Sequence, residues 1–455
     1  IINKIPQTIQ QYNPQRLYKE LDKTTNQFKY ETHIYYGGKD GDKIYLGHPI
    51  IVKDTLKKNM YPNEARLRKL TYASHIFCDI HIEYFVRNGE EETTSTKTFN
   101  KINIGKIPIM LHSKLCVLNE TPFDLRKNMG ECPYDQGGYF IIDGQEKVIV
   151  SHERKAENKL YIVKSQEDTY SYSAQIKSIP NNTFKYARTT VVNINKKTNE
   201  ITVRLPSIKT AIPLFILFRV LGIESDKEIL TYILYNLDHA KSILFQEFLR
   251  PSIENTGPIY SEQLATKYLS SFTQGNSISH LKDIIKSDVF PHMGDNVTNK
   301  AYYLGYTVNK LINVYYNIEP LTDRDSFVYK RVDLSGFLLA SLFRENFKQF
   351  QRDSKIAIDS EYRFNSSQYQ DEEYFNIIND ENLKKIFNHN VIETAIMKSF
   401  KIGTILNKKG LIQSLNRISN IGAISQLRRI NTYGDNIMIG QRKLHPTQFG
   451  IICPV

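Results

Sequence analysis

Cationic side chains gather in the last part of the chain, where they could hold phosphate groups. Residues 401–455 contain one acid, Asp435, and eight cations, and so carry more than half of the formal net charge of +12. An arginine fork can grip phosphate oxygens and thereby position a nucleic-acid backbone. The alternative is that these cations follow helix C-termini and are otherwise solvated. The eight cations are Lys401, Lys408, Lys409, Arg417, Arg428, Arg429, Arg442 and Lys443.

No pattern typical of a catalytic site accompanies this charge. The sequence has no Walker-type phosphate loop, no H-E-x-x-H motif, no glycine-flanked serine and no close group of aspartates for two-metal chemistry. Asp323-Arg324-Asp325 is interpreted as a structural ion-pair turn. His445 is interpreted as a loop histidine beside Pro446, with a role as ligand or base as the alternative. The four cysteines show no C-x-x-C pairing, so neither zinc ligation nor a disulfide framework is expected in this chain.

A second group of charges lies on a predicted β-hairpin at Gly137–Arg154. Asp143-Gly144 is a two-residue turn signal between two apolar runs. The returning strand carries Glu146, Lys147, His152, Glu153 and Arg154. Either this is the solvated face of an ordinary sheet, or a charged partner is expected beside it.

The rest of the chain must position these two groups. Residues 1–165 are rich in strand patterns and contain a short helix candidate after Pro62, and the polar stretch 164–173 is a domain-boundary candidate. A hairpin pattern follows at 189–206. The sequence up to residue 206 therefore predicts two structural units, each of which begins with strands.

Helices are predicted further along. One runs from Pro213 to a stop at Gly222, and the next opens with the S-x-x-E capping box at 225–228. Residues 334–400 are predicted to be helical apart from a polar surface excursion at 359–382. Apolar residues at every third position from 412 to 430 predict short helices, broken near Ser419-Asn420 and Gly422.

Length and composition indicate an intracellular globular protein. At 455 residues the chain can hold about three domains, and its pI of about 9.1 lowers the cost of approaching a polyanion. The most apolar helix candidate, 211–223, contains Arg219 and is too short to span a bilayer. No signal peptide opens the chain, the cysteine usage fits a reducing compartment, and a start at Ile1 indicates a fragment.

Six stretches follow one another in a recognisable order and cover nearly the whole chain. Together they resemble the second-largest, beta-type subunit of multisubunit DNA-directed RNA polymerases, in the form typical of eukaryotic polymerase II and nucleocytoplasmic large DNA viruses. The stretches are YPNEARLRKLTYAS (61–74), GKIPIMLHSKLCVLNE (105–120), ECPYDQGGYFIIDGQEKVIVSHERKAENK (131–159), IPLFILFRVLGI (212–223), DRDSFVYKRVDLSGFLLASLF (323–343) and SLNRISNIGAISQLRRINT…RKLHPTQFGIICPV (414–455).

The resemblance implies an α+β, multidomain architecture. Residues 1–168 and 335–400 would form the protrusion, 169–334 an inserted lobe, and 401–455 the start of the fork. Such a segment would line the DNA cleft and the RNA–DNA hybrid path of a nucleotidyltransferase. In this family the largest subunit chiefly holds the catalytic Mg²⁺, so no cofactor is expected in this segment, which is predicted to be inactive alone. The implied partners are the largest and smaller polymerase subunits, template DNA and the RNA–DNA hybrid.

Residues that match the family's motifs are the candidate contacts with nucleic acid. Lys408 and Lys409 lie in the first fork loop, beside the hybrid, and Arg442 and Lys443 lie in the second. In the family the strand with Lys147 and Arg154 lies near the hybrid path, and Glu146 and Glu153 are expected to hold those cations through ion pairs. The full set is Lys147, Arg154, Lys408, Lys409, Gln413, Arg417, Arg428, Arg429, Arg442 and Lys443.

A stand-alone basic DNA-binding or scaffold protein derived from such a subunit is the alternative function. A reading frame that continues past Val455 would favour the polymerase, and a natural stop codon there would favour the alternative. The chain is rich in Ile, Asn, Lys and Tyr and has no Trp, and its fork loops are short, which favours a large DNA virus as the source. The predicted location is the nucleus, or the host cytoplasm or virion for a viral protein.

Overall fold

The structure, a computed structural model, describes residues 2–21, 28–53, 56–88, 91–180, 187–273, 278–365, 368–432 and 444–453. The chain divides into two compact units. Unit 1 comprises Ile1–Arg154 and Val332–Asp435, and unit 2 comprises Lys155–Arg331 and Asn436–Val455. Each unit has its own hydrophobic core. The mixture of helices and sheets confirms the α+β multidomain class, whereas the assignment to protrusion, lobe and fork stays a prediction.

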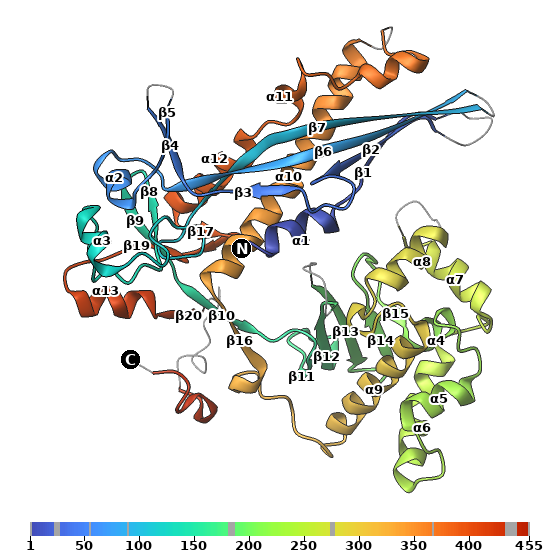
Figure 1. The fold of residues 1–455 in the computed structure, drawn as a ribbon. Coiled ribbons are helices and arrows are strands. Elements are labelled where there is room, and N and C mark those ends of the chain that lie inside the picture. Colours follow the sequence, from blue (N-terminus) through green and yellow to red (C-terminus); the bar gives the residue numbers. More distant parts are fainter. Residues whose placement is uncertain are drawn as a thin grey trace. The chain divides into compact units, whose positions relative to one another are not determined.

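Unit 1 is built on an antiparallel sheet with the strand order β1-β2-β6-β3, in which β7 also pairs with β6 (Figure 1). Side chains along β2 alternate between the core and the outer face, as expected for a sheet with one buried side. Helices α1, α10 and α12 supply the other half of the core. Tyr36, for example, lies 5.4 Å from Phe347 and 6.0 Å from Phe350 between ring centres. The elements are α1 (Lys4–Gln11), β1 (Gln15–Leu21), β2 (Phe28–Tyr36), β3 (Ile44–Leu46), β6 (Ala73–Asn88), β7 (Glu91–Pro108), α10 (Ser335–Phe364), the 3₁₀ helix η3 (Asp371–Asn376), α11 (Leu383–Ile386) and α12 (Asn390–Ile402).

The prediction of a surface excursion at 359–382 is wrong. Helix α10 continues to Phe364, and Tyr374, Ile377 and Ile378 are fully buried in the core of unit 1. Tyr374 stacks on Tyr30 at 4.5 Å between ring centres. Most residues of the stretch are solvated and polar, and only a few are buried. The average polarity of the stretch therefore did not reveal the buried side chains that fix it to the core.

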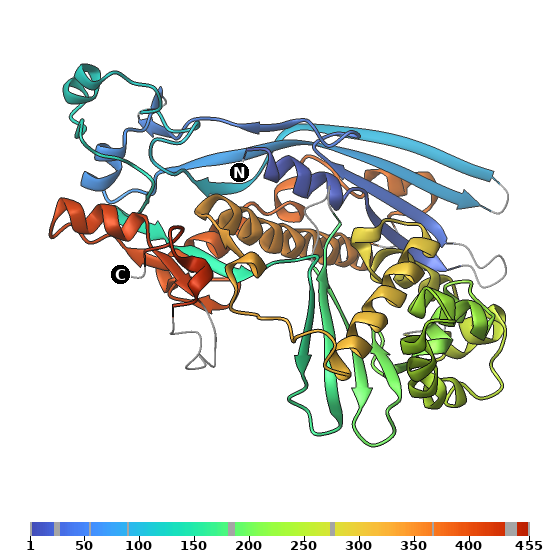
Figure 2. The ribbon, with the colours of Figure 1, turned by 90° about the horizontal axis from the view of Figure 1, so that it is seen from below.

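The smaller elements of unit 1 gather at one end of this sheet (Figure 1), and Figure 2 shows them from below. The short helix predicted after Pro62 is present as α2, and the hairpin predicted at 137–154 begins with β8 and β9. These elements are β4 (Ile50–Lys53), β5 (Leu56–Asn59), α2 (Pro62–Leu67), α3 (Phe123–Asn128), β8 (Phe140–Ile142), β9 (Gln145–Ile149), β10 (Ser151–Lys155), β17 (Thr404–Ile405), β18 (Lys408–Lys409), β19 (Ile412–Ser414), α13 (Asn420–Leu427) and β20 (Ile430–Thr432).

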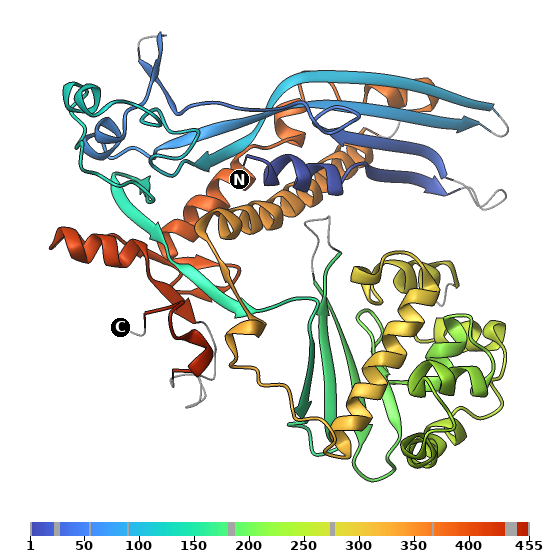
Figure 3. The same cartoon turned by 60° about the horizontal axis from the view of Figure 1, so that its bottom comes forward.

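Unit 2 consists of the antiparallel sheet β11-β12-β13-β14-β15 and a group of helices (Figure 3). The hairpin predicted at 189–206 is confirmed by the pairing of β13 with β14. Strand β16 lies where the chain passes from unit 2 to unit 1. The elements are β11 (Leu160–Lys164), β12 (Tyr170–Ser178), β13 (Arg188–Asn195), β14 (Ile201–Arg204), β15 (Ile212–Pro213), α4 (Leu214–Val220), α5 (Asp226–Leu234), α6 (Ala240–Glu254), α7 (Glu262–Ser270), α8 (Ile278–Ser287), α9 (Val297–Tyr315), β16 (Lys330–Asp333) and the 3₁₀ helices η1 (Pro291–Met293), η2 (Phe327–Tyr329) and η5 (Pro446–Gln448).

The predicted limits of α4 and the predicted start of α5 are confirmed, but one predicted cap is not formed. Pro213 precedes α4, and Gly222 follows it with a φ of +84°, which suits glycine. Ser225 is the N-cap residue of α5, yet its side chain makes no capping hydrogen bond. The next residue, Asp226, accepts a hydrogen bond of 2.6 Å from the fully buried Arg219. This pair offsets part of the cost of burying the guanidinium, because an unpaired buried charge is costly.

The turn at Asp323 and the loop at His445 meet in unit 2. The Asp323 carboxylate accepts a hydrogen bond of 3.0 Å from the backbone N–H of Asp325 and lies 2.7 Å from His445 Nε2. These hydrogen bonds give Asp323 a structural role and bring His445 to it, whereas an ion pair within the turn stays a prediction. Among the described residues, no helix is both long enough and apolar enough to cross a membrane.

Lys300 is a cation buried in the core of unit 2. Its side chain is fully excluded from solvent, and Nζ donates hydrogen bonds to the carbonyl oxygens of Ile285 (2.7 Å) and Lys286 (2.6 Å) at the end of α8. Burial disfavours the charged ammonium and lowers the pKa of Lys300 from 10.5 to about 8. The folded chain therefore releases this proton at a lower pH than the unfolded chain does.

Lys300 should make the stability of unit 2 rise with pH in the alkaline range. Between about pH 8 and pH 10.5 the unfolded chain binds more protons at this site, so its contribution to the free energy of unfolding increases, by about 3–4 kcal/mol in total. Below pH 8 both states are protonated and the contribution is constant. The free energy of unfolding, measured with urea across pH 7–10.5, should increase more with pH for the wild type than for Lys300→Met. Free energies that change in parallel for the two proteins would contradict this.

Candidate nucleic-acid interface

The predicted hairpin and the cationic C-terminal segment come together in one small sheet of unit 1. Asp143 and Gly144 turn the chain between β8 and β9 with φ values of +48° and +78°, as a two-residue hairpin loop requires. Strand β19 pairs antiparallel with β9, with Ser414 opposite Lys147. The Lys147 ammonium donates a hydrogen bond of 3.0 Å to Ser414 Oγ. Two regions separated by more than 250 residues in sequence thus share one site.

Strand β19 stands where a helix was predicted. The every-third spacing of apolar residues fits the helix α13 only over 420–427, whereas residues 412–414 pair with β9. The open edge of the β8–β9 hairpin offers backbone partners to this segment, and such tertiary pairing overrides a weak local pattern. Helix α13 begins near the predicted break, with the Ser419 hydroxyl accepting from the Gly422 N–H at 3.0 Å.

The buried amide of Gln426 fixes α13 to the segment before it. Its Oε1 accepts from the Asn416 N–H at 2.9 Å, and its Nε2 donates to the Ser414 carbonyl oxygen at 3.0 Å. Gln426 Nε2 also lies 3.4 Å from the side-chain oxygen of Gln413. Gln413 therefore serves partly as an internal brace, donating in addition to the Gly410 carbonyl oxygen at 3.1 Å.

Lys408 and Lys409 form strand β18 of a two-stranded hairpin with β17. Lys409 is exposed, and Lys408 is half-buried, with its Nζ 2.8 Å from His152 Nε2. His152 lies on β10, which pairs in parallel with β20 so that His152 is opposite Asn431. The first of the two predicted fork loops is thus tied to the charged strand of the hairpin region.

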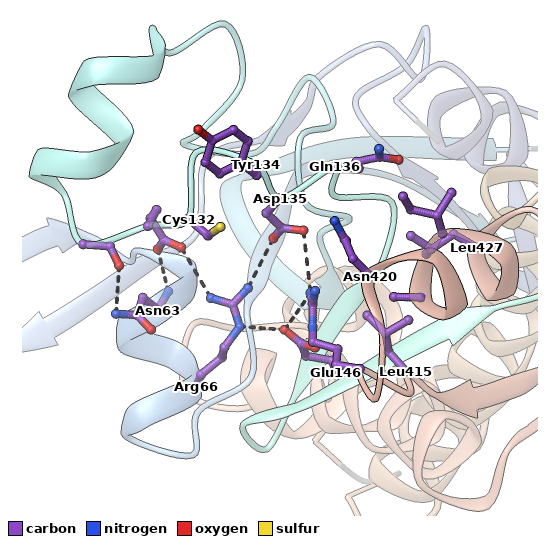
Figure 4. A pocket seen from close by; sticks show the side chains of 15 residues that line it. Asn63, Arg66, Cys132, Tyr134, Asp135, Gln136, Glu146, Leu415, Asn420 and Leu427 are labelled. Carbon is purple, nitrogen blue, oxygen red and sulfur yellow. Dashed lines mark hydrogen bonds and ion pairs between the residues drawn. The ribbon is translucent and has the colours of Figure 1, made fainter.

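A cluster of ion pairs joins α2, the loop before β8, β9 and the segment before α13 (Figure 4). The Arg66 guanidinium lies 2.9 Å from Glu146, 3.4 Å from Glu131 and 3.6 Å from Asp135. Arg417 forms two hydrogen bonds with Glu146, one of them at 3.1 Å, and lies 3.6 Å from Asp135. Hydrogen bonding to Glu146 raises the pKa of the Arg417 guanidinium. A pocket of about 460 Å³ opens beside the cluster.

The ion pairs differ from those predicted for the hairpin strand. Glu146 pairs with Arg66 and Arg417, whereas it was expected to hold Lys147 or Arg154. Side chains at Glu146 and Lys147 point to opposite faces of β9 because successive strand residues alternate. Arg154 pairs with Asp333 at 2.7 Å and lies 5.7 Å from the ring centre of Phe337. Both arginines thus have structural partners, and their predicted contacts with nucleic acid stay predictions.

The two predicted arginines that follow α13 have a different environment. Arg428 and Arg429 follow α13 and are both exposed. Among the described residues, no carboxylate forms an ion pair with Lys409, Arg428 or Arg429. Arg442 and Lys443 lie outside the described residues.

Arg66 and His152 are central to this geometry but are not among the residues predicted from the sequence. Arg66 is in α2 and Arg68 is the C-cap residue of that helix, and nothing in the local pattern distinguishes them. Arg66 nevertheless joins the ion-pair cluster, whereas among the described residues Arg68 pairs only with Glu64, on the surface. His152 was noted on the charged strand, and its position between apolar Val150 and the charged Glu153 was the only available signal.

Comparisons with known proteins match two ranges of the chain to family models and most of its length to relatives. A family model for the RNA polymerase beta subunit matches residues 4–380, and a model for RNA polymerase Rpb2, domain 3, matches residues 413–455. The chain is 34% identical over 433 residues to the DNA-directed RNA polymerase II subunit RPB2 of Encephalitozoon cuniculi and 32% identical over 441 residues to subunit 2 of the Arabidopsis thaliana enzyme. Both alignments cover 90% of this chain.

The chain spans 36% of the length of each of these two relatives. It spans 81% of the DNA-directed RNA polymerase subunit Rpo2N of Methanothermobacter thermautotrophicus, to which it is 28% identical over 440 residues. Since the first family model alone covers more than half of the residues, the resemblance seen in the sequence is confirmed. The chain belongs to the RNA polymerase beta subunit family.

Proposed function

We propose that this chain acts as the N-terminal part of the second-largest subunit of a DNA-directed RNA polymerase, of the polymerase II type. In that role it contributes to transcription by lining the DNA cleft and the RNA–DNA hybrid path, and it depends on the largest subunit for catalysis. Hairpin β17–β18, the β8–β9–β19 sheet and the end of α13 form its nucleic-acid surface. The named domains keep the predicted boundaries: protrusion 1–168 and 335–400, lobe 169–334 and fork 401–455.

This proposal rests on the difference between cations that form ion pairs with carboxylates and exposed cations that do not. Arg66, Arg154 and Arg417 have carboxylate partners that cancel much of their charge. Lys409, Arg428 and Arg429 are exposed and have no such partner among the described residues. Charges left uncompensated on a surface are the ones that attract phosphate groups and release counterions on binding.

A further finding supports the proposal. A relative of comparable extent, Rpo2N, is itself named as a polymerase subunit. As the resemblance implies, we expect the Mg²⁺ of the assembled polymerase to be held chiefly by the largest subunit. A nuclear location, or the host cytoplasm or virion for a viral source, follows from the same role.

Removing Lys408 and Lys409 tests the proposed surface. In the assembled polymerase, Lys408→Ala/Lys409→Ala should weaken retention of the RNA–DNA hybrid. The slope of log K against log salt concentration should become shallower by roughly one to two units, because each lysine that contacts a phosphate releases about one counterion. Hybrid binding measured across a salt titration gives this slope directly.

Lys384 and Lys385 provide a matched control. They are also adjacent in sequence, and both are exposed in α11 of unit 1. Lys384→Ala/Lys385→Ala removes the same charge and should leave the slope unchanged. Equal slopes in the two double variants would mean that Lys408 and Lys409 are only solvated, and would count against the proposed surface.

A further inference from the structure

His152 is buried at the point where three segments of unit 1 meet. It lies on β10 with 2% of its surface exposed. Its Nδ1 is 3.3 Å from the carbonyl oxygen of Asn431 on β20, and its Nε2 is 2.8 Å from the ammonium of Lys408 on β18. The imidazole thus bridges β20 and the β17–β18 hairpin.

The two contacts require the same form of the imidazole. A carbonyl oxygen can only accept, so Nδ1 carries the hydrogen. A lysine ammonium can only donate, so Nε2 must offer its lone pair. A neutral imidazole with its hydrogen on Nδ1 satisfies both at once. A protonated imidazolium would place a hydrogen, and a second positive charge, against Lys408.

A neutral acceptor affects a cation differently from a carboxylate. Glu146 orients Arg417 but also cancels its charge, as Asp333 does for Arg154. The imidazole of His152 orients the Lys408 ammonium and, being neutral, does not itself cancel the positive charge. Holding one end of a long, flexible lysine also reduces the side-chain entropy that is lost when it binds a phosphate.

We propose that His152 is a positioning residue that holds the Lys408 ammonium ready for a nucleic-acid phosphate, and that protonation of His152 releases it. This inference rests on the proposed function, because it assumes that Lys408 meets nucleic acid. It adds a regulatory feature: hybrid retention through Lys408 depends on the protonation of a buried histidine.

The groups around His152 favour the neutral form near neutral pH. Lys408 faces it from β18, Asp333 from β16, Glu153 is on its own strand, and the Asn431 carbonyl is on β20. Burial, followed by the Lys408 charge, lowers the pKa of His152, while Asn431, Asp333 and Glu153 act in the opposite direction. The positioning is therefore complete above the pKa of His152 and is lost as pH falls through it.

Four variants test the proposal in the assembled polymerase with a labelled RNA–DNA hybrid. They are His152→Leu, His152→Gln, Lys408→Ala and the double variant His152→Leu/Lys408→Ala. Hybrid affinity is measured over a salt titration at pH 7.5 and at a series of lower pH values, down to the lowest pH at which the polymerase stays folded. At pH 7.5 Lys408→Ala should flatten the salt slope by roughly one unit. His152→Leu should flatten the salt slope by nearly as much, and the double variant should bind the hybrid no more weakly than Lys408→Ala does.

Glutamine provides the rescue that separates positioning from simple packing. Its amide can donate to Asn431 and accept from Lys408 without titrating. His152→Gln should therefore restore most of the affinity at pH 7.5 and should keep it as the pH is lowered, whereas the wild type weakens as the pH falls through the pKa of His152. A His152→Gln variant as weak as His152→Leu, or a wild type that follows His152→Gln over the whole pH series, would overturn the proposal.

The same experiment distinguishes failure of this inference from failure of the proposed function. If Lys408→Ala leaves affinity and salt slope unchanged, Lys408 does not meet nucleic acid and the proposed surface is wrong at this residue. If Lys408→Ala weakens binding but His152→Leu, folded as judged by its melting temperature, does not, only the positioning role is wrong. Should His152→Leu fail to fold, the pH comparison of the wild type with His152→Gln decides alone.

Discussion

Replacing Arg66 with methionine is expected to lower the free energy of unfolding of unit 1 by about 3–4 kcal/mol at pH 7. Arg66 is the more buried of the two arginines that hold Glu131, Asp135 and Glu146, with 23% of its side chain exposed against 43% for Arg417. Without it, Glu131 loses its ion pair, and Asp135 and Glu146 share one partly exposed arginine. Their mutual repulsion and poor solvation are the source of the loss.

Arg66 also joins segments that are far apart in sequence. It connects α2 with Glu131 and Glu146, and its guanidinium lies 5.8 Å from the ring centre of Tyr139, which Arg417 approaches to 5.0 Å. We therefore expect Arg66→Met to loosen the segment that leads into α13 as well as to lower stability. Hydrogen exchange at 415–427 should increase in the variant.

Arg68→Met is the matched control for Arg66→Met. Arg68 follows two residues later and forms a surface pair with Glu64 at 2.8 Å, in which 48% of the Arg68 side chain is exposed. Its loss should cost no more than about 0.5 kcal/mol. Urea unfolding of both variants gives the comparison. Similar costs for the two variants would contradict the assigned role of the cluster.

Alanine at Gly305 is expected to destabilise unit 2 by about 2–3 kcal/mol. A Cβ added at Gly305 in α9 would lie 2.8 Å from the carbonyl carbon of Tyr232 in α5, with the carbonyl oxygen closer still. Backbone atoms cannot rotate away as a side chain can, so the two helices must separate. Overpacking of this kind exceeds the roughly 1 kcal/mol that alanine gains over glycine in a helix.

The contacts that would be lost lie along the whole α5–α9 interface. Asn309 Nδ2 donates a hydrogen bond of 2.8 Å to the carbonyl oxygen of Ile233, and Tyr232 stacks on Tyr302 with ring centres 4.4 Å apart. Leu304, next to Gly305, is fully buried. A small displacement at Gly305 therefore weakens packing over several turns.

Gly336→Ala separates the effect of close approach from that of helix propensity. Gly336 is in the first turn of α10, and an added Cβ would have no neighbour within 4 Å. This substitution should leave stability unchanged or raise it by up to about 1 kcal/mol. Thermal or urea unfolding should thus move in opposite directions for the two variants. A stabilised Gly305→Ala would show that α5 and α9 are not as close as described.

Local patterns were sufficient for elements whose signals lie within a few residues. Asp143-Gly144 predicted the β8–β9 turn because few residue pairs tolerate two consecutive positive φ values. Pro213 and Gly222 predicted the limits of α4 for the corresponding reasons at helix ends. The order of the polymerase-like stretches identified the family, since a long series of matches in sequence order does not depend on tertiary contacts.

Pairing between distant segments was beyond the reach of these patterns. Residues 412–414 have a spacing that also fits a helix, and only the open edge of β9 makes them a strand. The polar stretch at 359–382 hides Tyr374 among solvated residues, because composition averages over the few side chains that anchor it. Arg66 and Arg68 are equivalent in sequence and differ only in what the fold places around them.

The sequence by itself therefore determined the family, the local turns and helix ends, and which cations were available to meet a polyanion. The tertiary structure decided which of those cations are engaged elsewhere. Arg417 faces Glu146, and Lys408 faces the neutral acceptor of His152. The physical reason is that charge is a property of a residue, whereas its compensation depends on neighbours within a few ångströms, and these come from segments hundreds of residues apart.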